Sequence, residues 1–113
     1  MLSTVDHAGW KEKFLFFLGR FRRLKVDGNS MEPTLQSGDI VLYDPMGTVK
    51  IGDIALTSHP YIRDLKILKR VSEIGADGKL FLIGDNEADS TDSRTLGWFS
   101  PQQVKGKVVC RWK

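Results

Sequence analysis

From residue 26 to the C-terminus, short apolar runs alternate with clusters of Gly, Pro, Asp and Asn, and this alternation constrains the fold more than any other feature. Apolar runs bounded by such clusters are typical of β-strands joined by tight turns. The sequence therefore predicts a mostly β domain with little helix after residue 25. The expected strands cover residues 40–43, 54–57, 65–74, 79–83 and 104–112, and the third and fourth are expected to form a hairpin.

The size and composition of the chain favour one soluble domain. It has 113 residues, of which 41% are hydrophobic and 27% charged, enough apolar material for a single core. The formal net charge of +3 is small, and the pI is near 9.1. So small an excess of positive charge argues against binding to nucleic acid. Cys110 is the only cysteine and has no internal disulfide partner, which fits a protein in a reducing compartment or one that is insensitive to redox state. We expect Cys110 to be a small buried side chain.

Residues 1–25 are predicted to form an amphipathic basic helix. The apolar run at 14–18 is far shorter than the roughly 20 residues that a membrane-spanning helix needs, so the chain is not expected to cross a membrane. We expect the apolar stripe of this helix to dock on the domain or a partner, with contact to an anionic membrane surface as the alternative. The stripe comprises Trp10, Phe14, Phe17, Leu18 and Phe21, and the basic residues are Lys11, Lys13, Arg20, Arg22, Arg23 and Lys25.

Ser30 lies in a predicted turn built from permissive residues. Gly28 and Asn29 tolerate positive φ, and Pro33 favours an extended Glu32. A hydroxyl displayed on such a turn is a candidate nucleophile when a general base is within reach.

Lys69 is the candidate base. In the predicted strand at 65–71, the period of two places Lys69 on one face with Leu65, Ile67 and Val71. An apolar environment disfavours the ammonium and lowers the pKa of lysine from about 10.4, which allows the neutral amine to accept a proton. The alternative is a lysine at a sheet edge whose stem packs while its amine reaches water.

The polar segment 84–94 lies between two apolar strands and alternates acids with hydroxyls. It does not match a calcium-binding EF-hand loop, because Ser90 stands where the glycine is needed and Leu96 where the glutamate is needed. An Asp92–Arg94 ion pair or a hydroxyl network would stabilise the segment, and Ser90 could donate a hydrogen bond that orients a neighbouring amine.

These three segments together resemble the signal-peptidase (S26) superfamily of serine proteases, in which a Ser/Lys dyad replaces the Ser/His/Asp triad. Residues 30–39 are similar to the nucleophile box, 69–71 to the general-base box and 84–94 to the third box. The resemblance implies a signal-peptidase-like or LexA-like β-sandwich or partly open β-barrel as the catalytic domain at 26–113, preceded by the helix at 1–25.

The resemblance also implies roles for individual residues. Ser30 would attack the substrate carbonyl and form an acyl-enzyme, and Lys69 would remove the hydroxyl proton and later protonate the leaving amine. A serine matching Ser90 helps to orient the lysine in the family, and residues matching Asp92 and Arg94 form a supporting ion pair.

Gly28 marks a departure from the family, which often places an oxyanion-hole serine two residues before the nucleophile. The backbone N–H of Ser30 would then supply more of that stabilisation. Met31 is a candidate for substrate binding, and the strands near Ile40 and Ile54 are further candidate walls of the pocket.

The anchorless form of the chain is most similar to the maturation proteases of nickel-type superoxide dismutase. This similarity implies an endopeptidase that removes the N-terminal leader of a dismutase precursor and needs no cofactor. Because the sequence shows no signal segment, we expect a cytoplasmic location, with peripheral attachment to a membrane through the N-terminal helix as the qualification. The nickel would belong to the substrate, because His7, His59 and Cys110 are too scattered to form a metal site here. The self-cleaving repressor branch is less similar, since the residues before Ser30 are too few for a DNA-binding domain.

Three alternatives remain open from the sequence. The chain could be a signal-peptidase-like enzyme that cleaves other leader peptides. It could instead be a non-catalytic peptide-binding β domain. The third is an adaptor that binds a membrane or nucleic acid through its basic N-terminal segment. Replacement of Ser30 by Ala separates the proteases from the other two alternatives, because only the proteases depend on its hydroxyl. Neutralising Arg20, Arg22, Arg23 and Lys25 would remove the function of the adaptor alone.

Overall fold

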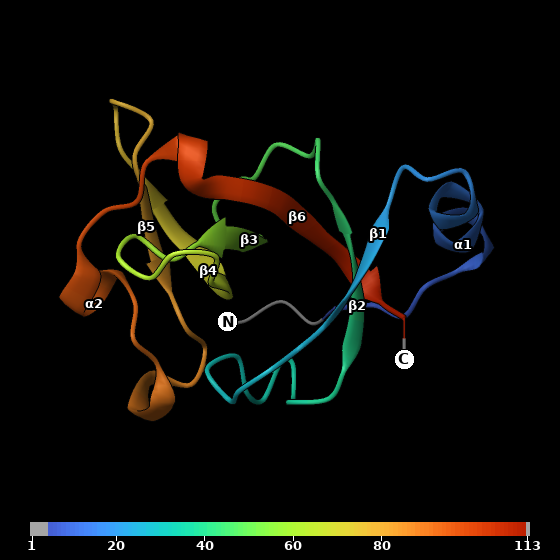
Figure 1. Cartoon of the computed structure of the whole chain (residues 1–113), viewed down its shortest axis with the longest axis horizontal. Coiled ribbons are helices and arrows are strands. Elements are labelled where there is room, and N and C mark those ends of the chain that lie inside the picture. The colour runs from blue at the N-terminus through green and yellow to red at the C-terminus, as the bar shows by residue number, and fades with distance from the viewer. Residues whose placement is uncertain (1–4, 113) are drawn as a thin grey trace.

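Six antiparallel strands form one open, twisted sheet in the computed structural model, which describes residues 5–112 (Figure 1). The spatial order is β1-β2-β6-β3-β4-β5, and β1 and β5 are its edges. The mostly β prediction is confirmed, with the sheet left unclosed. The strands are β1 Arg22–Lys25, β2 Ile40–Asp44, β3 Ile54–Ser58, β4 Lys66–Ile74, β5 Leu80–Ile83 and β6 Val104–Arg111. The helices are α1 Trp10–Phe17, η1 Glu87–Asp89, α2 Ser93–Leu96 and η2 Pro101–Gln103.

The N-terminal helix is shorter than predicted. Helix α1 ends at Phe17, and Gly19 adopts a left-handed φ of 84° that turns the chain away from the helix. Residues 22–25, predicted as helix, instead form β1, because their backbone pairs antiparallel with β2. The prediction of a single helix through residue 25 is therefore wrong, and tertiary pairing overrides the helical spacing of the apolar side chains.

The predicted hairpin is present as β4 and β5, and the turn between them contains Gly78 with a φ of 84°. Side-chain alternation on β3 and β4 divides the apolar residues between the two faces of the sheet. Ile54, Leu56 and Leu68 join one cluster with Met31, whereas Ala55 and Val71 join another with Phe99. The segment that carries Ser30 covers the first cluster, so the nucleophile candidate is held by the core itself.

A third apolar cluster lies beneath α1. It contains Phe21, Leu42 and Cys110, with Leu15 and Phe16 of α1 packed against it. Cys110 is buried as expected, and burial raises the pKa of its thiol to about 11. The expected docking of the apolar stripe on the domain is confirmed only for Phe21, which is buried; it is wrong for Trp10, Phe14, Phe17 and Leu18, which are all exposed. Docking of these four side chains on a partner stays a prediction.

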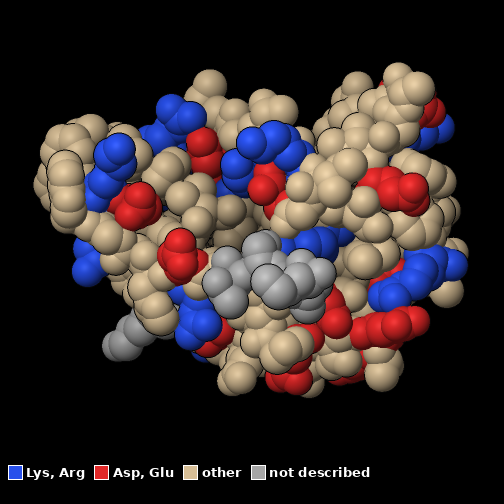
Figure 2. Space-filling model, turned by 180° about the vertical axis from the view of Figure 1, so that it is seen from behind, with Lys and Arg blue, Asp and Glu red and all other residues tan. Residues whose placement is uncertain are grey.

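The surface carries charges of both signs. Figure 2 shows Lys and Arg interspersed with Asp and Glu over the face seen from behind, in keeping with the small net charge. Within residues 5–112, no helix has the length and apolar character required to span a bilayer.

Candidate functional site

Ser30 lies on the segment that follows β1. Gly28 has a φ of 91°, a left-handed conformation that favours glycine, and it turns the chain just before the serine. The side chains of Met31 and Leu35 are fully buried in the first apolar cluster. Their burial fixes the segment against the sheet and leaves Ser30 half-buried at its surface.

Lys69 lies in the middle of β4, directly opposite Ala55 of β3. Its exposed fraction is only 4%. Burial lowers the pKa of the Lys69 amine below its usual value; the negative charge of Asp92 partly offsets this effect, and the positive charge of Arg94 adds to it. The period-two prediction that Lys69 is desolvated among apolar neighbours is therefore confirmed, and the snorkelling alternative does not apply.

Ser90 connects the lysine to a buried carboxylate. Lys69 Nζ donates to Ser90 Oγ at 3.2 Å, and Ser90 Oγ donates to Asp92 Oδ2 at 2.7 Å. The sequence suggested that Ser90 would be the donor toward the amine, but its single hydroxyl proton is directed at Asp92. Ser90 therefore accepts from the lysine, which leaves the lone pair of a neutral amine directed elsewhere.

Asp92 is held as a charged group. Arg94 forms an ion pair with it at 2.6 Å, and the backbone N–H of Gly84 donates to it at 2.8 Å. Burial alone would raise the pKa of Asp92, but hydrogen bonds from Arg94, Gly84 and Ser90 together lower it well below the usual range. The carboxylate thus remains ionised at neutral pH and keeps the Ser90 hydroxyl oriented.

Gly84 brings the serine segment and the lysine network together. A Cβ at this position would collide with Ser90 Oγ and would lie 2.7 Å from the carbonyl oxygen of Ser30. Next to it, the N–H of Asn86 donates to that same carbonyl at 2.8 Å, and the Asn86 side chain donates to the Asn29 carbonyl at 3.1 Å. The backbone of Ser30 and the hydroxyl of Ser90 thus both lie against the position that a Cβ of residue 84 would occupy.

Arg70, next to Lys69 on the opposite face of β4, forms a second buried network. It pairs with Asp85 at 2.6 Å and donates to the Gly52 carbonyl at 2.7 Å. Thr34, on the serine segment, donates to the same Asp85 carboxylate at 2.6 Å. The period of two in residues 65–71 places Arg70 on the face away from Lys69, but it does not predict the burial of Arg70 or its ion pair. The available signal was the presence of Arg70 and Asp85 in two of the three boxes.

Ser30 and Lys69 line the same cleft, which has a volume of about 170 Å³. Its lining comes from residues 24–28, 30 and 31 on the serine segment, from residues 65–69, and from Leu56 of β3. Gly28 and Met31 also line it, although Met31 is almost fully buried. Of the two strands expected as walls, the one that begins at Ile54 contributes Leu56 to the lining, as predicted. The strand that begins at Ile40 contributes no lining residue, so that part of the prediction is wrong.

Neither reactive group of Ser30 is occupied by another part of the described chain. Within residues 5–112, the Ser30 hydroxyl makes no direct hydrogen bond to Lys69, and the Ser30 N–H has no hydrogen-bond partner. The hydroxyl and the N–H are thus both free to engage a substrate carbonyl in the cleft. The arrangement can support nucleophilic attack by an alcohol with an amine as base.

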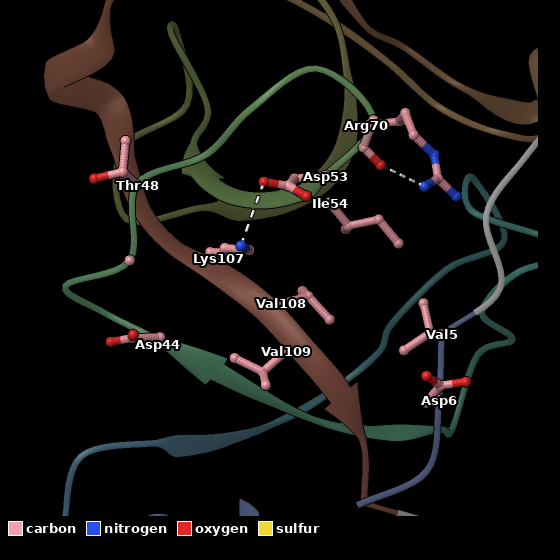
Figure 3. A pocket seen from close by; sticks show the side chains of 12 residues that line it. Val5, Asp6, Asp44, Thr48, Asp53, Ile54, Arg70, Lys107, Val108 and Val109 are labelled. Atoms are coloured by element: carbon pink, nitrogen blue, oxygen red, sulfur yellow. Dashed lines mark hydrogen bonds and ion pairs between the residues drawn. The ribbon is translucent and has the colours of Figure 1, made fainter.

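A larger cavity of about 350 Å³ lies on another part of the sheet (Figure 3). Its charged lining residues are largely neutralised: Lys107 pairs with Asp53 at 3.6 Å, and Asp44 pairs with Arg20 at 2.9 Å. It contains neither Ser30 nor Lys69. Size alone therefore does not identify the site, because the groups capable of chemistry meet in the smaller cleft.

In the described part of the chain, no three His, Cys, Asp or Glu side chains gather as metal ligands.

Comparison with known families bears on this arrangement. A family model described as Peptidase S24-like matches residues 10–109. The chain belongs to the peptidase S24-like family. This match covers α1, the strands β1 to β5, most of β6 and every residue of the two buried networks. The S24-like family lies in the LexA and signal-peptidase-like superfamily, in agreement with the superfamily that the three sequence segments resemble.

This S24-like chain is also similar to mitochondrial inner membrane protease subunit 1 of several organisms. It is 29% identical to the Schizosaccharomyces pombe protein over 97% of this chain and 83% of that protein. It is 29% identical to the Xenopus tropicalis protein and 30% identical to the Homo sapiens protein, over 74% and 72% of this chain. The chain spans 64% and 63% of the lengths of these last two relatives.

Proposed function

We propose that this S24-like chain is a serine endopeptidase that removes N-terminal leaders from precursor proteins by means of a Ser30/Lys69 dyad. The observation that carries the proposal is the cleft in which a free serine hydroxyl and a buried amine both lie. The relatives named as inner membrane protease subunits support a protein substrate.

The mechanism begins with proton transfer. Neutral Lys69 accepts the proton of Ser30 Oγ as this oxygen attacks the scissile carbonyl, and the resulting ammonium then protonates the leaving amine. An ester joins Ser30 to the N-terminal part of the substrate. A water molecule, deprotonated by Lys69, attacks this ester and releases the product acid, which restores the Ser30 hydroxyl.

The groups around the dyad favour this cycle. Burial keeps a neutral form of Lys69 accessible, whereas Asp92 stabilises the ammonium that forms in each half-reaction. Ser90 holds one N–H of the amine, so that the lone pair can point into the cleft. The unpartnered Ser30 N–H is the candidate oxyanion donor, and Gly28 lets the chain present it.

The proposal extends to the identity of the substrate. The precursor of a nickel-type superoxide dismutase remains the candidate suggested by sequence resemblance, and other leader-bearing precursors are the alternative. Cytoplasmic localisation likewise remains a prediction.

Incubation of the purified chain with a candidate precursor, followed by N-terminal sequencing of the product, tests the proposal. We expect one new N-terminus, lost in both Ser30→Ala and Lys69→Ala and retained in the control variants Ser72→Ala and Lys79→Ala. A wild-type chain that binds leader peptides without cleaving any of them would instead establish the non-catalytic peptide-binding alternative.

A further inference from the structure

Helix α1 presents an apolar stripe to solvent. The exposed fractions are 80% for Trp10, 54% for Phe14, 84% for Phe17 and 62% for Leu18. These four residues are spaced i, i+4, i+7 and i+8, so they share one face of the helix and its C-terminal turn. We call them the aromatic stripe. Four large apolar side chains gathered on one exposed helix face are unusual on a soluble surface and mark an interaction site.

The other side of α1 is already occupied by the domain. Leu15 and Phe16 pack against the cluster beneath the helix, and the rings of Phe16 and Trp112 lie 4.9 Å apart. Arg23 lies over the Phe16 ring at 5.2 Å. Rotating the aromatic stripe inward would require Phe16 to leave these contacts, so the stripe is held facing outward.

Positive charge surrounds the aromatic stripe. At 100° per residue, Lys11 falls on one side of the stripe and Lys13 on the other. Arg22, Arg23 and Lys25 follow on β1 and are exposed. Glu12, the sole acidic residue between residues 10 and 25, accepts a hydrogen bond from the Gly9 N–H at the start of the helix. The apolar face is thus bordered by lysines and followed by a basic strand.

We propose that the aromatic stripe docks this protein on the surface of an anionic lipid bilayer. Large apolar side chains with lysines on their flanks are the pattern of helices that lie in the plane of a bilayer interface, and Trp is favoured at that depth. Each basic residue near an anionic leaflet adds attraction. An eight-residue helix is about 12 Å long, so α1 lies along the interface and does not cross a core about 30 Å thick.

The docking is independent of the proposed peptidase activity. The stripe is on α1, whereas the Ser30 cleft is lined by residues 24–28, 30, 31 and 65–69 with Leu56. Membrane contact would concentrate the enzyme where precursor leaders with apolar segments gather, but it does not require Ser30. Ser30→Ala should therefore bind vesicles as the wild type does, which separates failure of this inference from failure of the proposed function.

Vesicle co-sedimentation tests the inference. We expect the wild type to sediment with vesicles of equal parts phosphatidylcholine and phosphatidylglycerol, more weakly in high salt, and at most weakly with phosphatidylcholine alone. Phe14→Ser/Phe17→Ser should reduce the partition coefficient about tenfold or more. Lys11→Gln/Lys13→Gln should reduce it about fivefold for each charge removed. The matched controls Met46→Ser and Lys79→Gln change exposed residues elsewhere and should bind normally.

Thermal unfolding of each variant provides the folding control, since substitutions at exposed stripe positions should leave the melting temperature close to that of the wild type. The inference is overturned if the stripe variants bind anionic vesicles as strongly as the control variants do, or if the wild type does not bind these vesicles. It is also overturned if light scattering shows that the stripe joins two copies of the chain, with dimers lost in Phe14→Ser/Phe17→Ser and no vesicle binding by the wild type.

Discussion

Two basic residues stand side by side on β4, and the structure treats their charges in opposite ways. Lys69 is buried against a hydroxyl, Ser90, with the nearest carboxylate one residue further along the hydrogen-bond chain. Arg70 is buried directly against the Asp85 carboxylate. A buried ammonium without a direct counterion readily loses its proton, whereas a buried guanidinium paired with a carboxylate remains charged.

The difference assigns a catalytic role to one residue and a structural role to the other. Lys69 faces a cleft that contains the candidate nucleophile, so its amine can exchange a proton there during catalysis. Arg70 joins β4 to Asp85 and, through Thr34, to the serine segment. One face of the strand thus carries the proposed base, and the other holds the elements that position it.

The largest expected effect is the loss of activity in Lys69→Met. Removing the general base should lower kcat/KM by about 10²- to 10⁴-fold. The free energy of unfolding should stay the same or rise, because a buried amine is replaced by an apolar side chain of similar length. Parallel kinetics and urea denaturation measure both quantities; a large loss of stability in this variant would contradict the distinction between the two residues.

The stability of Lys69→Met relative to the wild type should also depend on pH. Because the folded-state pKa of Lys69 is lowered, its burial penalty is complete below that pKa and disappears as the pH rises toward the ordinary lysine value. The stability advantage of Lys69→Met should therefore be greatest at low pH and shrink at alkaline pH. An advantage that grows with pH would contradict the assigned direction.

Arg70→Met, unlike Lys69→Met, should lower the free energy of unfolding. It leaves the Asp85 carboxylate, whose side chain is fully buried, without its cation, and breaking such a pair costs about 3 to 5 kcal/mol of unfolding free energy. Urea denaturation at neutral pH measures the loss. The double variant Arg70→Met/Asp85→Leu should recover part of it, since no buried charge remains. Equal stabilities of the wild type and Arg70→Met would show that the pair is not structural.

Gly84→Ala tests whether close packing at Gly84 fixes the Ser30 segment relative to Ser90. The added methyl would meet the Ser30 carbonyl and Ser90, so we expect a loss of about 1 to 3 kcal/mol from overpacking, together with most of the activity. Gly75→Ala is the control, because its nearest neighbour is the exposed and movable Asp77 side chain. Similar effects at both glycines would mean that the contact at Gly84 is not special.

The smallest expected effect is a shift in the pH profile of Arg94→Gln. The positive charge of Arg94 lowers the pKa of Lys69, so its removal should move the rising limb of kcat/KM to higher pH. Glu87→Gln, which removes the more distant partner of Arg94, is the control and should leave the limb in place. A shift of the Arg94→Gln profile to lower pH would reverse the electrostatic assignment.

Local patterns in the sequence were sufficient for the hairpin, which follows from two apolar runs joined by a turn. They were also sufficient for the burial of Lys69, which follows from the period of two in residues 65–71. They were insufficient for β1, since the aromatic spacing of residues 10–21 fits a helix and only pairing with β2 reveals a strand. The Arg70–Asp85–Thr34 network joins residues 15 and 51 positions apart. Such contacts depend on how the sheet folds back and leave no periodic signal.

The titration of the Lys69 amine tests the central claim most directly. The chain can be labelled with ¹⁵N at lysine Nζ and followed by NMR as a function of pH, with Lys69→Met used to assign the resonance. We predict that the Lys69 amine loses its proton at a lower pH than the exposed lysines of the same chain. A Lys69 amine that titrates together with the exposed lysines, or above them, would contradict the account.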